Sequence, residues 1–298
     1  MTDGLSQASG TLSGNKMMNA LSNMNIGIMP TTFGNAGGPR QAPEDADFVD
    51  GPIKYKRHIV RFLSDADQLT ALLPDGLVLR GEPMAQFHFF CLREIPWLAG
   101  RGYNILSLMI PVAHAGSSGA AVNGVFCAAM WENLGDPIIT GREQLGHPKL
   151  YAQLPDPRAL NGTTHIRASW EHFTFAEMEL SCEVPAAPNV VSDFVTSAGS
   201  GIIAHKYIPR SGQWDVADAD YLTLSPMNGM SNRRDPQPPP TVKAGTGTIR
   251  FNLPRWQDMP TQYHIVRKLA ALEQQAPLEA LVMEGTTYLD FRDQIILT

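Results

Sequence analysis

The chain of 298 residues is long enough to bury a substantial hydrophobic core, as one large domain or two small ones. With 43% apolar and 17% charged residues, its composition is typical of a globular protein that buries much of its surface, for example in a homo-oligomer. The net charge of −6 argues against a nucleic-acid partner, because no basic stripe is available to neutralise phosphates. No apolar run approaches the ~20 residues that span a bilayer, and the N-terminus lacks a secretory signal. We therefore expect a soluble, cytoplasmic protein without a membrane partner.

Residues 1–48 are rich in Gly, Ser, Asn, Met and Pro and show no sustained period. This composition predicts an N-terminal arm, flexible or in contact with a neighbouring subunit, ahead of one domain over residues 49–298. A helix is predicted over residues 65–73, with Asp65 as its N-cap and Pro74 after its end.

Most of the chain after this helix is predicted as strand. Residues 84–92 place Gln86 and His88 on one face and aromatic residues on the other. Residues 104–112 and 124–131 are largely apolar, which is expected for strands covered on both sides. Residues 165–184 alternate along their whole length and predict one long strand or two bent ones, with no turn signal between them.

The C-terminal third adds a strand over residues 247–253, a helix over 261–275 and a closing strand over 285–297. A Pro/Gly-rich loop is expected over residues 231–247. Many strands, few helices and no βαβ rhythm predict a mainly β protein. We expect an antiparallel sheet, or a closed β-barrel with a few helices packed outside.

Motifs for cofactors and metals are missing from the sequence. It has no phosphate-binding loop, its eight histidines are scattered, and its three cysteines form no CxxC pair. We therefore expect no metal site, no cofactor and no disulfide framework, with the cysteines present as reduced, buried thiols.

The segment WENLGDPIITGREQLGHPKL (131–150) resembles the signature of the acetoacetate decarboxylase superfamily, with an acidic turn ending in Pro, a short strand, Gly-Arg-Glu and then Pro-Lys. Similar landmarks occur in the same order along residues 48–298, including GPIKY (51–55), LLPDGL (72–77), EPMAQF (82–87) and Tyr103. The resemblance implies a cone-like antiparallel β-barrel that assembles into large homo-oligomers. It also implies that Lys149 forms a Schiff base with a ketone.

The chemistry expected of Lys149 has a physical basis. A lysine amine with a pKa near ~10.4 is protonated at neutral pH and is then no nucleophile, whereas burial disfavours the ammonium form. The resemblance implies that Lys149 is activated in this way. Once formed, an iminium withdraws electrons and allows a neighbouring C–C bond to break.

Several positions depart from the pattern of the family. Leu150 stands where a second lysine would lower the pKa of the first, so desolvation must act alone unless Arg142 or His147 points inward. Ile105 replaces an acid–base glutamate two residues after the tyrosine. His88 replaces a second glutamate and, beside Gln86, is either the substitute acid–base or an interior hydrogen-bonded histidine.

The substrate-binding residues are also open to alternatives. Arg57 is the nearest candidate for the arginine that binds a substrate carboxylate, with Arg61 as its rival. Tyr103 either orients the substrate through its hydroxyl group or belongs to the core.

We therefore predict a cofactor-independent Schiff-base enzyme that breaks or makes a C–C bond in a small carbonyl substrate, larger and less polar than acetoacetate. A decarboxylase, a retro-aldol lyase and an aldolase–dehydratase all share the iminium and the enamine. The alternatives are a non-catalytic barrel that binds an apolar ligand, and cofactor-free acid–base catalysis by His88.

Overall fold

The computed structural model describes residues 28–29, 52–116, 121–227, 237–288 and 294–297. The chain divides into two units, residues 1–45 and 46–298, and the helices and strands given below belong to the second. The arm predicted over residues 1–48 therefore lies, apart from residues 28 and 29, outside the described residues.

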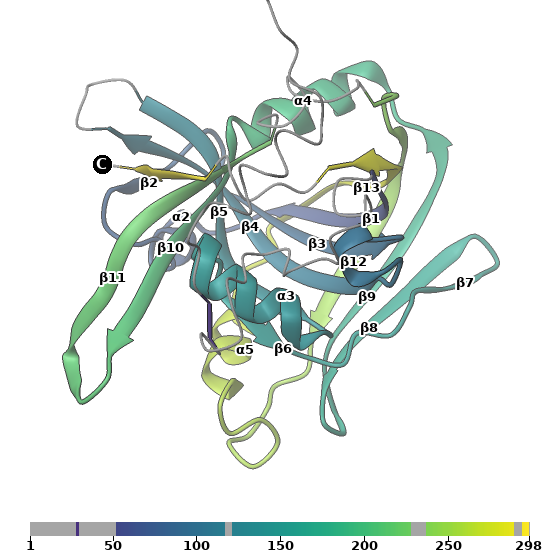
Figure 1. Ribbon diagram of the computed structural model, residues 1–298. Coiled ribbons are helices and arrows are strands. Elements are labelled where there is room, and N and C mark those ends of the chain that lie inside the picture. The colour runs from purple at the N-terminus through teal and green to yellow at the C-terminus, as the bar shows by residue number, and fades with distance from the viewer. Residues whose placement is uncertain (1–27, 30–51, 117–120, 228–236, 289–293, 298) are drawn as a thin grey trace, which may run out of the picture. The chain divides into compact units, whose positions relative to one another are not determined.

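The second unit is mainly β, as predicted (Figure 1). Its strands are β1 Ile53–Leu63, β2 Leu77–Leu79, β3 Met84–Arg93, β4 Tyr103–Ala115, β5 Ala121–Glu132, β6 Lys149–Tyr151, β7 Arg158–Leu160, β8 Thr163–Trp170, β9 Phe173–Pro185, β10 Gly201–Arg210, β11 Gln213–Pro226, β12 Thr241–Phe251, β13 Ala276–Thr287 and β14 Ile295–Leu297.

All of these strands belong to one sheet, paired in the order β14-β11-β10-β5-β4-β3-β1-β13-β12-β9-β8-β7, with β2 added to β4 and β6 to β5. Most neighbours are antiparallel; β10 and β6 each pair with β5 in parallel. Within the described residues β14 and β7 are the two ends of the sheet and do not pair with each other. The closed barrel expected from the sequence is therefore not confirmed.

The helical segments are α2 Ala66–Thr70, η3 Pro96–Leu98, α3 Gly135–Thr140, η4 Gly141–Leu145, α4 Pro188–Ala198 and α5 Tyr263–Ala270. The two helices predicted from the sequence are confirmed by α2, whose cap Asp65 accepts a hydrogen bond from the backbone of Gln68, and by α5. Helix α4 was not predicted. None of the helices in the described part of the chain has the length and apolarity needed to cross a bilayer.

Three local expectations need correction. The segment over residues 165–184 is a hairpin of β8 and β9, which turns through Glu171 at a φ of 49° although it lacks Gly, Pro or Asn. The loop predicted over residues 231–247 ends earlier, because β12 begins at Thr241; residues 231–236 lie outside the described part. The short strand before Gly-Arg-Glu is instead helix α3, which continues into the π-helical turn η4.

Strands β3, β4 and β5 are buried on both faces of the sheet, as their apolar sequences predicted. One face carries the main core, which includes Phe87, Phe89, Leu106, Leu108 and Trp131. The other face carries a smaller cluster, which includes Leu92, Tyr103, Ile105, Met109 and Met130. Because side chains alternate along a strand, polar residues at positions of the second set also face this smaller cluster.

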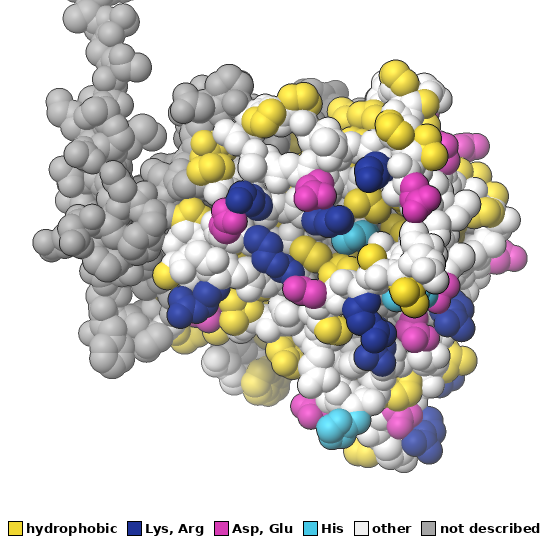
Figure 2. All heavy atoms as spheres, turned by 90° about the vertical axis from the view of Figure 1, so that its right-hand side faces the viewer, with side chains coloured by type: hydrophobic (Ala, Val, Ile, Leu, Met, Phe, Trp, Pro, Cys, Tyr) yellow, Lys and Arg dark blue, Asp and Glu magenta, His cyan; other side chains and the backbone are white. Residues whose placement is uncertain are grey.

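The segment α3–η4–β6 lies against this second face, because β6 adds to the end of β5 in parallel (Figure 1). Charged side chains of both signs are interspersed over the surface drawn in Figure 2. Buried titratable residues, among them Lys149 and Glu132, lie inside, between β3–β4–β5 and the α3–η4–β6 segment.

Candidate active site

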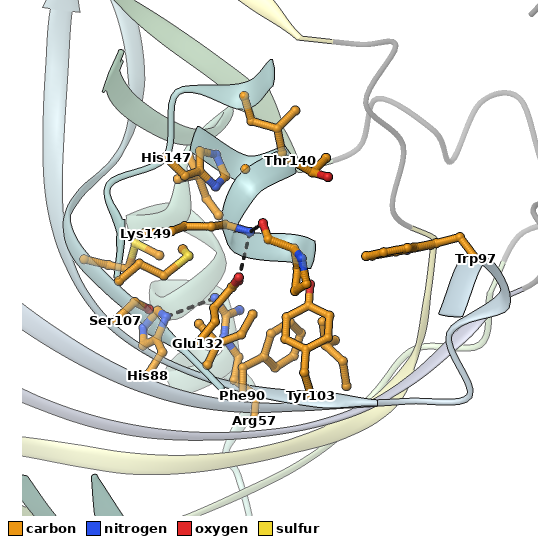
Figure 3. Close-up of a pocket in the computed structure, with 18 residues that line it drawn as sticks. Arg57, His88, Phe90, Trp97, Tyr103, Ser107, Glu132, Thr140, His147 and Lys149 are labelled. Atoms are coloured by element: carbon orange, nitrogen blue, oxygen red, sulfur yellow. Dashed lines mark hydrogen bonds and ion pairs between the residues drawn. The ribbon is translucent and has the colours of Figure 1, made fainter. Parts of the chain in front are cut away.

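A cavity of about 140 Å³ lies between the second face of the sheet and the segment α3–η4–β6 (Figure 3). Its lining is largely apolar and includes Phe90, Leu92, Trp97, Ile105, Met109, Met130, Pro137, Gly141, Leu145 and Ile202. The polar groups around it are Arg57, His88, Tyr103, Ser107, Glu132, Thr140, His147 and Lys149. A mostly apolar cavity with a few polar groups is typical of a small-molecule site.

Lys149 extends into the centre of this cavity, and its side chain is only 7% exposed. It opens strand β6, in register with Met130 on β5. Its Nζ lies 2.8 Å from Glu132 Oε1 and donates a hydrogen bond of 3.0 Å to the carbonyl oxygen of Pro137 in α3. The lysine is thus a buried amine with one charged partner, rather than an exposed charge in a loop.

Glu132 is the last residue of β5, and its side chain is completely buried. Burial raises the pKa of its carboxyl group, and the nearby Lys149 opposes this rise only in part. Its second oxygen, Oε2, has no hydrogen-bond partner within the described residues. Sequence reasoning missed this residue. The available signal was an acidic residue that ends an apolar strand two positions after Met130.

Arg142 holds Lys149 from outside the cavity. It is exposed, and its Nη1 donates a hydrogen bond of 2.9 Å to the backbone oxygen of Lys149. It does not line the cavity, so the inward orientation considered from the sequence is wrong. Leu150 also points away, since it packs against the main core.

His147 does line the cavity, and its Nε2 lies 2.9 Å from the Ser225 hydroxyl of β11. Burial, with a smaller contribution from Lys149, lowers the pKa of its imidazole to about 3. His147 is therefore neutral near pH 7 and does not supply the second positive charge that would take the place of the missing lysine.

Arg57 and His88 form the opposite wall, where Arg57 Nη2 lies 3.0 Å from His88 Nδ1. A guanidinium group only donates hydrogen bonds, so Nδ1 of His88 is the acceptor and the ring proton resides on Nε2. That Nε2 is buried and has no partner within the described residues. Burial, together with Arg57 and Arg61, places the pKa of His88 well below its usual value. His88 is therefore a neutral ring that offers an N–H group.

Of the two candidate arginines, only Arg57 lines the cavity. It packs between the rings of Phe90 and Phe194, at 5.3 and 5.7 Å from their centroids. Burial lowers its pKa to about 10, which still leaves it charged at neutral pH. Arg61 instead donates a hydrogen bond to the backbone oxygen of Glu279 and is not part of the lining.

The remaining predicted residues divide into two groups. Tyr103 and Ile105 line the cavity; burial, with a contribution from Glu132, raises the pKa of the tyrosine well above its usual value, so its hydroxyl is neutral. Gln86 does not line it; its amide lies 3.4 Å from Ser197 Oγ, beneath α4. Within the described residues, no group of three or more His, Cys, Asp or Glu side chains could hold a metal ion.

A family model described as acetoacetate decarboxylase (ADC) matches residues 28–287. The chain belongs to the acetoacetate decarboxylase family. An acetoacetate decarboxylase of Burkholderia mallei is 31% identical to it over 110 residues, which are 36% of this chain and 41% of the relative. The chain thus matches less than half the length of this curated family member.

Two solved structures of the family fold are similar in backbone. Acetoacetate decarboxylase from Legionella pneumophila has a TM-score of 0.59 at 17% identity, over 98% of both chains. The enduracididine biosynthesis enzyme MppR, complexed with pyruvate, has a TM-score of 0.57 at 14% identity, over 86% of this chain and 93% of its own. At these identities the likeness concerns the fold alone.

Proposed function

We propose that this protein is a cofactor-independent carbon–carbon lyase that forms a Schiff base between Lys149 and the ketone of an oxo acid. The observation that carries this proposal is the buried Lys149–Glu132 pair, 2.8 Å apart, inside a largely apolar cavity. Membership of the acetoacetate decarboxylase family supports the same class of chemistry.

Glu132 activates the amine in this proposal. A buried carboxylate beside a buried ammonium can exchange one proton to give a carboxylic acid and a neutral amine. The raised pKa of Glu132 favours this charge-free form. The nucleophile is then generated within the pair, which accounts for activity without the second lysine that Leu150 replaces.

The catalytic sequence uses the proton that Glu132 has gained. The Lys149 amine adds to the ketone carbon, and the carbinolamine oxygen leaves as water after it takes up a proton from Glu132. The resulting iminium accepts the electron pair of the bond between the α and β carbons as that bond breaks. This gives an enamine and releases carbon dioxide, or an aldehyde whose hydroxyl proton passes to the Glu132 carboxylate. Protonation of the enamine carbon and hydrolysis of the iminium then release the product and restore Lys149.

Arg57 and His88 bind the substrate carboxylate. Among the residues with described positions, neither Nε of Arg57 nor Nε2 of His88 has a hydrogen-bond partner, so both N–H groups can donate to the acid. The Lys149–Glu132 pair has no net charge wherever its shared proton lies, and the neutral histidines add none, so the charge of the cavity comes from Arg57. The cavity therefore holds one net positive charge and favours a monoanionic substrate.

The apolar lining favours a substrate with more hydrocarbon than acetoacetate. The hydrocarbon side chains of Phe90, Leu92 and Ile105 offer no hydrogen bonds to a polar chain end. Decarboxylation, retro-aldol cleavage and aldol condensation with dehydration all pass through the same iminium and enamine. The pyruvate complex of MppR supports an oxo acid as the substrate class.

The test is reductive trapping. The protein is incubated with 2-oxopentanoate, 3-oxo acids and aryl ketones, then reduced with borohydride, and the added mass is mapped by peptide mass spectrometry. The proposal expects one substrate-dependent adduct on Lys149, retained in Lys243→Met, which alters an exposed lysine, and lost in Lys149→Met. Turnover that survives Lys149→Ala would favour acid–base catalysis by His88. Tight binding without adduct or product would favour a barrel that only binds a ligand.

A further inference from the structure

His147 and His88 are both neutral rings on the cavity wall, and the hydrogen-bond partner of each ring determines which of its nitrogens carries the proton. At His88 the donor Arg57 occupies Nδ1, so the cavity meets an N–H group. The hydrogen bonds of His147 lead to the opposite arrangement.

The Ser225 hydroxyl connects His147 to the C-terminal segment. It donates a hydrogen bond of 2.6 Å to Gln294 Oε1, which as an amide oxygen only accepts. A hydroxyl group has a single proton, so toward His147, at 2.9 Å, Ser225 Oγ must be the acceptor. The Nε2 of His147 therefore carries the proton, and its Nδ1 holds the lone pair.

The lone pair on Nδ1 has no hydrogen-bond donor among the residues that the structure describes, although the ring lines the cavity. A neutral imidazole offers one donor and one acceptor, and the donor is already used by Ser225. His147 is therefore a built acceptor near the nucleophile Lys149, across the cavity from the donors of Arg57 and His88 (Figure 3).

We infer that His147 recognises a hydroxyl group on the substrate, which makes hydroxylated oxo acids the substrate class of this site. This inference rests on the proposed function, because it needs the ketone on Lys149 and the carboxylate at Arg57. A hydroxyl is the simplest group that can donate to Nδ1, and a site built for a donor discriminates against an analogue that lacks it. Ser225 acts through His147 as a positioning residue.

The experiment compares 4-hydroxy-2-oxopentanoate with 2-oxopentanoate, which lacks only the hydroxyl group. The concentration that gives half-maximal borohydride trapping on Lys149 is measured for each acid, with all adducts on that residue counted. We expect the hydroxylated acid to be preferred about fivefold or more, the factor that one hydrogen bond supplies. We expect His147→Phe to abolish this preference, so that the half-maximal concentrations of the two acids become equal.

A second variant tests the tautomer. Ser225→Ala removes the acceptor that holds the proton on Nε2, so we expect a smaller preference together with a change in the ¹⁵N resonances of His147. A purely structural role of Ser225 would not move those resonances.

The inference is overturned if the wild-type protein traps both acids equally well, or if the preference persists in His147→Phe. If neither acid forms an adduct on Lys149, the proposed function itself fails. The two failures are therefore distinguishable.

Discussion

Gly141 leaves the space through which the side chain of Lys149 reaches the cavity. A Cβ atom placed on Gly141 would overlap the Cδ, Cε and Nζ atoms of Lys149. The backbone of Gly141 has a φ of −65°, which any residue adopts. The glycine is therefore required for room and not for conformational freedom.

We expect Gly141→Ala to lower the yield of the Lys149 adduct by about tenfold or more, because an amine displaced by about 1 Å loses its attack geometry. The matched control is Gly135→Ala at the start of α3, where an added Cβ would meet no atom within 4 Å. Reductive trapping and thermal unfolding are measured for both. Equal trapping in the two variants would show that the lysine does not need this path.

Replacement of Glu132 by Gln removes the internal proton acceptor while the shape of the side chain is kept. We expect adduct formation at pH 7 to slow by about 100-fold, the lower range for loss of a positioned acid–base group. Because solvent must then deprotonate Lys149, the trapping rate of Glu132→Gln should rise steadily as pH increases. A pH profile that matches the wild type would mean that Glu132 has no part in activating the amine.

The contrast between Lys149 and Glu132 shows what the sequence could reveal. Lys149 was predicted because a contiguous segment carries its whole setting, including Gly141 and Pro148. Glu132 is 17 positions away, and its role depends on β6 pairing in parallel with β5, which no local pattern encodes. The orientation of Arg142 could not be predicted, because the sequence does not distinguish an arginine that points into the cavity from one that binds a backbone carbonyl outside it.

Much of the fold was predictable, since amphipathic spacing defined α5 and apolar runs defined β3, β4 and β5. The turn at Glu171 was not, because it uses a positive φ without the residues that favour one. Whether the sheet closes was not predictable either, since closure depends on contacts between its first and last strands.

Arg57→Met tests the carboxylate site. We expect half-maximal trapping of 2-oxopentanoate to need about a tenfold higher concentration or more, because the buried guanidinium is the charged partner of the acid. Trapping of 2-pentanone, which lacks the carboxylate, should change little. Arg250→Met alters an exposed arginine and is the control. An equal loss for the acid and the neutral ketone would show that Arg57 shapes the cavity without binding the anion.

We expect the buried His58 to make the free energy of unfolding depend on pH. It is buried on β1, and burial, with a contribution from Lys56, lowers its pKa to about 4, against about 6.5 in the unfolded chain. Between these values the unfolded state binds more protons, so the free energy of unfolding falls as pH drops below about 6.5. From pH 7.5 to 5 this residue should cost about 2 kcal/mol.

Urea unfolding at the two pH values measures this loss. We expect His58→Phe to lose a correspondingly smaller part of its stability on acidification, and His264→Gln, which alters an exposed histidine on α5, to behave as the wild type. An unchanged pH dependence in His58→Phe would assign the acid sensitivity to other buried groups.

In the three-residue strand β6, the register with β5 decides which side chain enters the cavity, because successive residues point to opposite faces of the sheet. Lys149 is opposite Met130, whose side chain lines the cavity, and Leu150 is opposite Trp131, whose side chain lies in the core. A slip of one residue would exchange their faces, sending the amine toward Trp131 and a hydrocarbon chain toward the substrate. If insertion or deletion of a single residue between Gly141 and Lys149 shifts this register, adduct formation should be lost as completely as in Lys149→Met. Substitution of Gln144 keeps the number of residues between Gly141 and Lys149, so the register of β6 and adduct formation should be retained.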